Sequence, residues 1–331
     1  MPDMIWFVLA VVVGLIVLVW SADRFVAGAA GLARALGVST LIIGLTIVAF
    51  GTSAPEMLVS AVAALQGNAG LAIGNAIGSN IANMALVLGV TAVIAPLSVH
   101  SNTLNREFPL MLVVMVVALV LLWNGLLSRV DGLILLAGMV AVVLWTIHLA
   151  RTSGTQDPLI EELKEEIPAH MPRGRAWWLL ASGLLLLLAS SKLLVWGAVG
   201  IAQYYGVSDL VIGLTIVAIG TSLPELAASV VAARKNEHDI AVGNVVGSNL
   251  FNIMAVLGIA GTIAPTEVDP AVLYRDFPLM LILAVALYLM ARGFSRDGHG
   301  VIQRWAGLLL LLVFLAYQTS LFLMVAGKST A

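Results

Sequence analysis

Ten long apolar stretches make up most of this 331-residue chain, and they constrain its fold more than any other feature. Each approaches the roughly 20 apolar residues that a helix needs to cross a bilayer. Backbone polar groups in lipid must be satisfied within a helix or a closed barrel, and these stretches lack the alternation of barrel strands. We therefore expect an all-α integral membrane protein with ten transmembrane helices. The stretches fall at roughly residues 4–22, 39–65, 71–94, 108–124, 130–150, 177–201, 209–233, 240–263, 277–292 and 303–326.

Composition excludes several classes of protein. Hydrophobic residues make up 61% of the chain and charged residues only 10%, with a mean hydropathy of +1.06. Because a soluble domain carries roughly a quarter charged residues, we expect the chain to have the lipid bilayer around it. The net charge of −2 gives no support for a nucleic-acid partner. Cysteine is absent, which excludes disulfides and thiolate metal sites.

The distribution of Lys and Arg residues predicts how the chain lies across the membrane, because positive side chains favour the cytoplasmic side. If the N-terminus lies outside, 12 of the 16 basic residues are cytoplasmic. Only Arg129, Arg275 and Lys328 then lie outside, and Lys192 falls within a span. We therefore expect a multi-pass protein of the bacterial inner membrane with both termini in the periplasm.

The chain contains an internal repeat. Residues 44–96 align without a gap with residues 213–265 at a constant offset of 169, and 28 of the 53 aligned positions are identical. We expect a first five-helix repeat at 1–150, a cytoplasmic loop at 151–176 and a second five-helix repeat at 177–331. An odd number of helices in each half inverts one repeat relative to the other. Inverted repeats with interrupted helices are typical of secondary transporters, which hold their substrate near the midplane.

Each repeat carries a proline followed by a glutamate inside an apolar span, as Pro55-Glu56 and Pro224-Glu225. Proline removes a helical hydrogen bond, so it predicts an interrupted helix with free backbone carbonyl groups. An ionised carboxylate at this depth costs a few kcal/mol or more, so each glutamate needs a partner. Two such glutamates in matching contexts indicate a binding site shared by the repeats.

A polar stripe follows each glutamate in the next span. Its members recur every four residues, which places them on one helical face: Asn75, Ser79 and Asn83 in the first repeat, and Asn244, Ser248 and Asn252 in the second. Hydrogen bonds between helices explain Asn75, Asn80, Asn244 and Asn249 at least as well as ligation does. The better site candidates are Ser79, Asn83, Ser248 and Asn252.

The side chains of these motifs offer oxygen atoms, from two carboxylates, several hydroxyl groups and several amides. Hard cations such as Ca²⁺ take six to eight oxygen ligands, whereas softer metals prefer imidazole or thiolate. None of the five histidines lies in the motif spans, which argues against zinc and copper. An enzyme is also disfavoured, because the motif is not that of a serine hydrolase and offers no His or Lys as a base.

The motifs G-T-S-x-P-E and G-N-x-x-G-S-N, present in both halves, resemble the α-repeats of the cation/Ca²⁺ exchanger superfamily, and within it the bacterial sodium/calcium antiporters. The resemblance covers essentially the whole chain and implies the sodium/calcium exchanger fold, with Glu56 and Glu225 as central cation ligands. It implies no cofactor besides the transported Ca²⁺ and Na⁺. It also implies oxygen ligands around the glutamates, from Thr52, Thr221, Ser53, Ser222, Ser79, Ser248, Asn83 and Asn252 and from the backbone of Ala49 and Ala218.

We therefore expect a secondary active antiporter that exchanges Na⁺ for Ca²⁺ by alternating access, and not an enzyme. Because both ions need the same carboxylates, occupancy by one excludes the other, which favours exchange. The alternative is a Ca²⁺/H⁺ or other cation/H⁺ antiporter of the same fold. This alternative stays open because the family often has aspartate at the position of Asn252, whereas this chain has asparagine at both 83 and 252. A calcium channel is a further alternative, disfavoured because two halves that gate one site do not easily open together.

Overall fold

The computed structural model describes residues 2–35, 49–99, 104–152, 171–292 and 300–328, and in these ranges the chain is almost entirely helical. Eight helices within these ranges are long and apolar enough to cross a membrane. They confirm an all-α, multi-pass membrane protein. The first part of the expected span at 39–65, the first residues of the repeat at 44–96 and most of the expected loop at 151–176 lie outside the described residues. The eight helices span Met4–Ala29, Ala69–Ile94, Arg129–His148, Arg173–Tyr205, Asp209–Arg234, His238–Ile263, Val272–Arg292 and Arg304–Met324.

The described elements of the first half end with α8. In chain order they are α1 (Pro2–Ala35), α3 (Ala49–Thr52), α4 (Ala54–Leu65), α5 (Ala69–Ala82), the π-helical turn η2 (Asn83–Val87), α6 (Leu88–Ile94), β1 (Leu97–Val99), α7 (Leu104–Leu122), β2 (Leu126–Leu127) and α8 (Arg129–Thr152). The apolar helices α4 and α7 coincide with two further expected spans, at 39–65 and 108–124.

The second half begins with α10 and repeats the order of the first. Its elements are α10 (Arg173–Tyr205), α11 (Asp209–Ile212), η3 (Gly213–Val217), α12 (Ala218–Thr221), α13 (Leu223–Arg234), α14 (His238–Phe251), η4 (Asn252–Val256), α15 (Leu257–Ile263), β3 (Thr266–Glu267), η5 (Val272–Asp276), α16 (Phe277–Arg292), β4 (Gly300–Ile302) and α17 (Arg304–Lys328). The runs 69–94 and 238–263 are the most buried of the eight spans, so they form the centre of the molecule.

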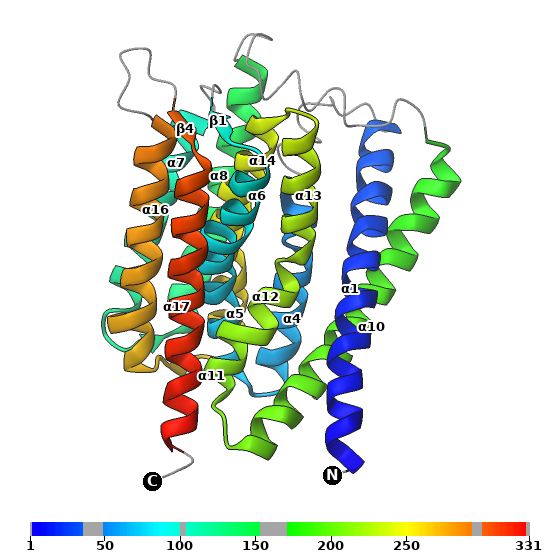
Figure 1. Ribbon diagram of the computed structural model, residues 1–331. Coiled ribbons are helices and arrows are strands. Elements are labelled where there is room, and N and C mark those ends of the chain that lie inside the picture. The colour runs from blue at the N-terminus through cyan, green and yellow to red at the C-terminus, as the bar shows by residue number, and fades with distance from the viewer. Residues whose placement is uncertain (1, 36–48, 100–103, 153–170, 293–299, 329–331) are drawn as a thin grey trace.

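The first helix of each half lies to one side of the other helices. In Figure 1, α1 begins at the lower end and α10 begins at the upper end, so the two helices pack side by side in opposite directions. Glycine makes this contact possible, because a Cβ atom on Gly28 would overlap the backbone nitrogen of Leu180. At the position equivalent by the offset of 169, a Cβ on Gly197 would lie 2.7 Å from the backbone oxygen of Phe7. The close approach is therefore built in the same way from both helices.

Two short antiparallel strand pairs join the halves outside the apolar stretches. β1 pairs with β4, with Ser98 opposite Val301, and β2 pairs with β3, with Leu127 opposite Thr266. In each pair one strand comes from the first half and one from the second. β1 and β4 lie at the upper end in Figure 1. These strands are not predictable from the sequence, because two- or three-residue segments carry no readable periodicity.

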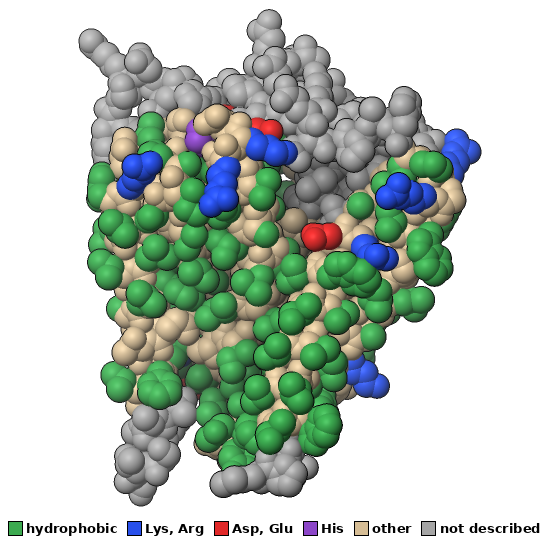
Figure 2. Space-filling model, turned by 45° about the vertical axis from the view of Figure 1, so that its right-hand side comes forward, with side chains coloured by type: hydrophobic (Ala, Val, Ile, Leu, Met, Phe, Trp, Pro, Cys, Tyr) green, Lys and Arg blue, Asp and Glu red, His purple; other side chains and the backbone are tan. Residues whose placement is uncertain are grey.

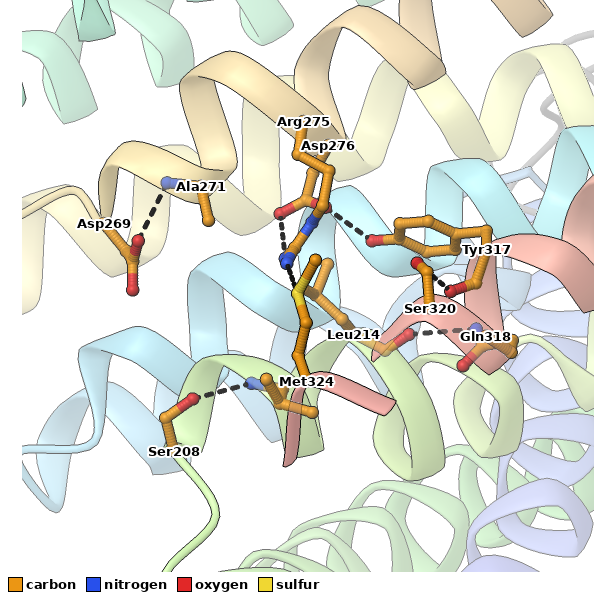
Figure 3. Close-up of polar contacts among 11 residues, drawn as sticks. Ser208, Leu214, Asp269, Ala271, Arg275, Asp276, Tyr317, Gln318, Ser320 and Met324 are labelled. Atoms are coloured by element: carbon orange, nitrogen blue, oxygen red, sulfur yellow. Dashed lines mark hydrogen bonds and ion pairs between the residues drawn. The ribbon is translucent and has the colours of Figure 1, made fainter. Parts of the chain in front are cut away.

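A buried ionic cluster joins η5, the turn that leads into α16, to α17 (Figure 3). The Asp276 carboxylate is fully buried and accepts two hydrogen bonds from the guanidinium of Arg275, at 2.6 and 3.0 Å. It also accepts a hydrogen bond of 2.8 Å from the hydroxyl of Tyr317 on α17. These partners satisfy a carboxylate that would otherwise be costly to bury.

We expect Tyr317→Phe to lower the stability of the folded protein by about 1 kcal/mol, because the buried Asp276 loses one donor. Thermal unfolding of the detergent-purified protein measures the change. The matched control is Tyr274→Phe, since the Tyr274 side chain is exposed. Equal unfolding temperatures for the two variants would contradict the prediction.

The surface in Figure 2 has the character of a membrane protein. Hydrophobic side chains cover the sides of the molecule, and most of the Lys and Arg side chains visible in this view lie toward its upper end. Large apolar residues such as Trp6, Leu185 and Phe322 are well exposed on the outer helices. Such a surface is stable against lipid but not in water.

Candidate cation site

Both proline-containing spans are interrupted, as the sequence predicts. Ser53 forms a turn between α3 and α4, and Ser222 forms the same turn between α12 and α13. Pro55 and Pro224 then lie in the first turn of the new helix, where the missing N–H group of proline has no intrahelical partner to lose. The interruption places the N-terminal ends of two helices inside the molecule.

Glu56 and Glu225 lie in the first turns of α4 and α13, and both side chains are fully buried. A carboxylate in this position is stabilised by the partial positive charge of the helix N-terminus. The two motifs meet here, because Thr52, four residues before Glu56, contacts the hydroxyl of Ser248, which donates to Glu225. Among the described residues, neither carboxylate oxygen of Glu56 has a hydrogen-bond partner, and Oε2 of Glu225 has none either. These oxygens have acceptor capacity that a bound cation would fill.

The two threonines of the motifs each contact the opposite half. Thr52 lies 3.2 Å from Oδ1 of Asn244, to which its hydroxyl donates, and 3.3 Å from the hydroxyl of Ser248. Thr221 makes the equivalent contacts with the first half. Its hydroxyl donates to Oδ1 of Asn75 at 3.1 Å and lies 3.3 Å from the hydroxyl of Ser79. The site is therefore assembled across the interface of the halves by reciprocal contacts at the offset of 169.

Asn75 and Asn244 hold the glutamate-bearing helices in place. Nδ2 of Asn75 donates to the backbone oxygen of Glu56 at 3.2 Å and to the hydroxyl of Ser60 at 2.9 Å. Nδ2 of Asn244 makes the same two contacts, with the backbone oxygen of Glu225 and with the hydroxyl of Ser229, both at 3.4 Å. This agrees with hydrogen bonding between helices as the role of both asparagines. Ser60 and Ser229 are not among the predicted site residues, although they are an identical pair of the repeat.

The two copies differ in how a serine meets the glutamate. Ser248 donates to Oε1 of Glu225 at 3.1 Å, whereas Ser79 donates to Oδ1 of Asn75 at 3.3 Å. Glu56 therefore receives no hydrogen bond from the serine equivalent to Ser248 in this conformation.

Four buried asparagines lie at the centre of the interface. Asn80 donates to the backbone oxygen of Asn249, and Asn83 donates to its Oδ1, both at 3.3 Å. Asn83 and Asn252 each begin a π-helical turn, η2 and η4, a feature frequent at functional sites. Oδ1 of Asn83 and both polar atoms of the Asn252 side chain have no partner among the described residues. The wider turns thus present amide groups that can still accept a ligand.

The interior therefore offers a set of oxygen ligands with two negative charges. Besides the glutamate and amide oxygens, the hydroxyls of Ser53 and Ser222 are buried without a hydrogen-bond partner in the described part of the chain. Ala49 and Ala218 begin α3 and α12, beside the interruptions. No group of three or more His, Asp or Glu side chains placed to hold a metal ion occurs among the described residues. Two carboxylates with neutral oxygens suit a hard cation such as Ca²⁺ or Na⁺.

Comparison with known proteins gives one family. A model of the family described as sodium/calcium exchanger protein matches residues 6–148 and 175–323. The chain is 49% identical over 312 residues to a putative antiporter CaxA of Alkalimonas amylolytica, covering 94% of this chain and 97% of that protein. It is 44% identical over 293 residues to the inner membrane protein YrbG of Escherichia coli, covering 88% and 90%. It is 32% identical over 347 residues to the sodium/calcium exchanger MaX1 of Methanosarcina acetivorans, covering 95% and 98%.

Solved structures of the sodium-calcium exchanger NCX_Mj are similar over nearly the whole chain. One, from a crystal soaked with 2.5 mM Na⁺ and 10 mM Sr²⁺, has a TM-score of 0.67 and 34% sequence identity, and it covers 96% of this chain and 99% of that one. Another, soaked with 2.5 mM Na⁺ and 0.1 mM Ca²⁺, has a TM-score of 0.65 and 34% identity, and it covers 95% and 98%.

Proposed function

Because the chain belongs to the sodium/calcium exchanger protein family, a family of membrane cation antiporters, we propose that it exchanges Na⁺ for Ca²⁺ across the inner membrane by alternating access. One observation carries the proposal beyond the family. The two fully buried glutamates lie at an interface whose polar contacts repeat reciprocally between the halves. One site built from both halves suits alternating access, since it can be exposed from either side.

We assign the central cation to Glu56 and Glu225, whose carboxylates balance the charge of one divalent ion. We assign the remaining ligands to other oxygen atoms of the two motifs. Thr52 and Thr221 contribute beside the carboxylates, and Asn83 and Asn252 form the central amide pair. Flanking sodium sites take hydroxyl and backbone oxygens from Ser53, Ser79, Ser222, Ser248, Ala49 and Ala218.

The proposed topology has ten transmembrane helices in two inverted repeats, at 1–150 and 177–331. The opposite directions of α1 and α10 support it, as does the spacing of the two segments that the family model matches, which begin 169 residues apart. Because Lys and Arg gather at the upper end in Figure 2, we assign this end to the cytoplasm. α1 begins and α17 ends at the opposite end in Figure 1, so we assign both termini to the periplasm.

A two-carboxylate site explains why transport would be an exchange. When the site is empty, both glutamates are buried in a medium where an unpaired charge is costly, so reorientation of an empty, ionised site is unfavourable. Ca²⁺ or Na⁺ removes this cost by neutralising the carboxylates. The site therefore returns across the membrane only when another cation has replaced the first.

We expect proteoliposomes that contain the protein to take up ⁴⁵Ca²⁺ when they are preloaded with Na⁺ and diluted into Na⁺-free buffer. Dilution of K⁺-loaded vesicles of the same osmolarity, and of protein-free liposomes, provides the controls. A pH gradient is imposed in a third set of vesicles. Calcium uptake that follows the pH gradient and is indifferent to Na⁺ would replace the proposal by cation/H⁺ antiport.

A further inference from the structure

Two of the proposed cation ligands of the second half, Ala218 and Thr221, lie on a helical face that begins in η3. Leu214, Ala218 and Thr221 are spaced by four and three residues, so they share one face. This face lies against α5, where a Cβ on Gly78 would be 2.8 Å from both the Cα of Leu214 and the Cβ of Ala218. The next residue of α5, Ser79, contacts the Thr221 hydroxyl. The position of Leu214 against α5 therefore determines where Ala218 and Thr221 stand in the site.

A side chain from α17 holds the Leu214 backbone. Nε2 of Gln318 donates a hydrogen bond of 3.4 Å to the backbone oxygen of Leu214, as Figure 3 shows. Leu214 lies in the π-helical turn η3, where the α-helical hydrogen-bond pattern is disturbed. A side-chain donor at such a turn supplies a partner that the bilayer interior does not.

The helix that carries Gln318 is itself fixed at the preceding residue. The hydroxyl of Tyr317 donates to the buried carboxylate of Asp276, which Arg275 also holds. Tyr317 and Gln318 are consecutive, so they point in different directions around α17. Tyr317 anchors α17 to η5 while Gln318 reaches η3, so the Gln318 amide is presented from a helix of defined position.

The last helices of the two halves differ at the position of Gln318. The last helices of the two halves begin at Arg129 and Arg304, 175 residues apart, so Gln318 corresponds to Val143, an aliphatic side chain. An amide side chain at this position therefore distinguishes the last helix of the second half from that of the first.

We infer that Gln318 is a positioning residue, which holds η3 and through it Ala218 and Thr221 in the geometry that binds the cation. This inference rests on the proposed cation site. It predicts that Gln318→Leu raises the KM for Ca²⁺ by about 3- to 10-fold, the range that loss of one hydrogen bond gives, with the maximal rate within about twofold of the wild type. The Kd for Ca²⁺, measured by isothermal titration of the purified protein, should rise by the same factor.

Gln318→Glu separates positioning from a general packing role. A protonated carboxyl group can donate to the Leu214 oxygen, whereas an ionised one cannot. The ratio of the Gln318→Glu Kd to the wild-type Kd should therefore fall toward one as the pH is lowered, and the same ratio for Gln318→Leu should stay constant. Thr319→Val is the matched control, because the exposed Thr319 hydroxyl bonds only within α17, to the Leu315 oxygen.

Two results would overturn the inference, and they differ from failure of the proposed function. If the wild type binds Ca²⁺ and Gln318→Leu binds it equally well, Gln318 does not position the site. The same conclusion follows if the ratios for Gln318→Glu and Gln318→Leu change with pH in the same way. If the wild type itself binds no Ca²⁺, the proposed function fails.

Discussion

Glu56→Gln and Glu225→Gln are each expected to reduce Na⁺-driven ⁴⁵Ca²⁺ uptake to below about 1% of the wild-type rate. Each substitution keeps the shape of the side chain and removes one of the two negative charges available to the cation. Loss of one partner from a buried charged contact costs about 3–5 kcal/mol, which corresponds to two or more orders of magnitude in affinity.

Folding provides the internal check on this result. Removing a buried charge should leave the thermal stability without calcium unchanged or higher, since Glu56 is fully buried and without a hydrogen-bond partner in the described part of the chain. The wild type should gain thermal stability when Ca²⁺ is added, because a ligand that binds only the folded state stabilises it. Neither variant should show this gain. The control is Glu267→Gln, a substitution of the same chemistry at an exposed strand residue. Exchange at the wild-type rate in either site variant would mean that the cation binds elsewhere.

Gly28→Ala is expected to lower transport at least about tenfold and to reduce thermal stability. A Cβ at this position would overlap the backbone nitrogen of Leu180 and lie 2.8 Å from the backbone oxygen of Ala176. Backbone atoms cannot rotate away, so α1 and α10 must separate, at a cost of about 1–3 kcal/mol for overpacking. Proteoliposome flux and thermal unfolding measure the two effects.

The matched control for this substitution is Gly174→Ala, on α10. No heavy atom would lie within 4 Å of a Cβ there, and alanine favours helix formation over glycine. Gly174→Ala should therefore leave stability unchanged or increase it. If both variants behave alike, the contact between α1 and α10 is looser than the structure indicates.

The repeat and the interrupted helices were readable from sequence because their signals are local. Pro55-Glu56 inside an apolar run needs no knowledge of the fold to mark a helix break with a buried charge. The four-residue spacing of Asn75, Ser79 and Asn83 likewise fixes one helical face. Each of these motifs also occurs in both repeats, and this duplication strengthens the prediction drawn from either copy.

Other parts of the site depend on packing between distant segments, which no local pattern reports. Thr52 meets Asn244 across 192 positions of the chain, and Gln318 meets Leu214 across 104. The π-helical turns at Asn83 and Asn252 arise from one residue more per turn, and the sequence carries no marker for them. For Asn75 and Asn244 the sequence leaves two alternatives open, hydrogen bonding between helices and cation ligation.

The short strand pairs limit how such a molecule can move. β1 with β4 and β2 with β3 each fasten the first half to the second, and neither pair includes α1 or α10. Because both strand pairs join the two halves, we expect the halves not to separate along their interface. We expect relative motion instead between the other helices and the pair formed by α1 and α10, which lie outside both strand pairs. We then expect access to Glu56 and Glu225 to depend on the position of α1 and α10 relative to the other helices.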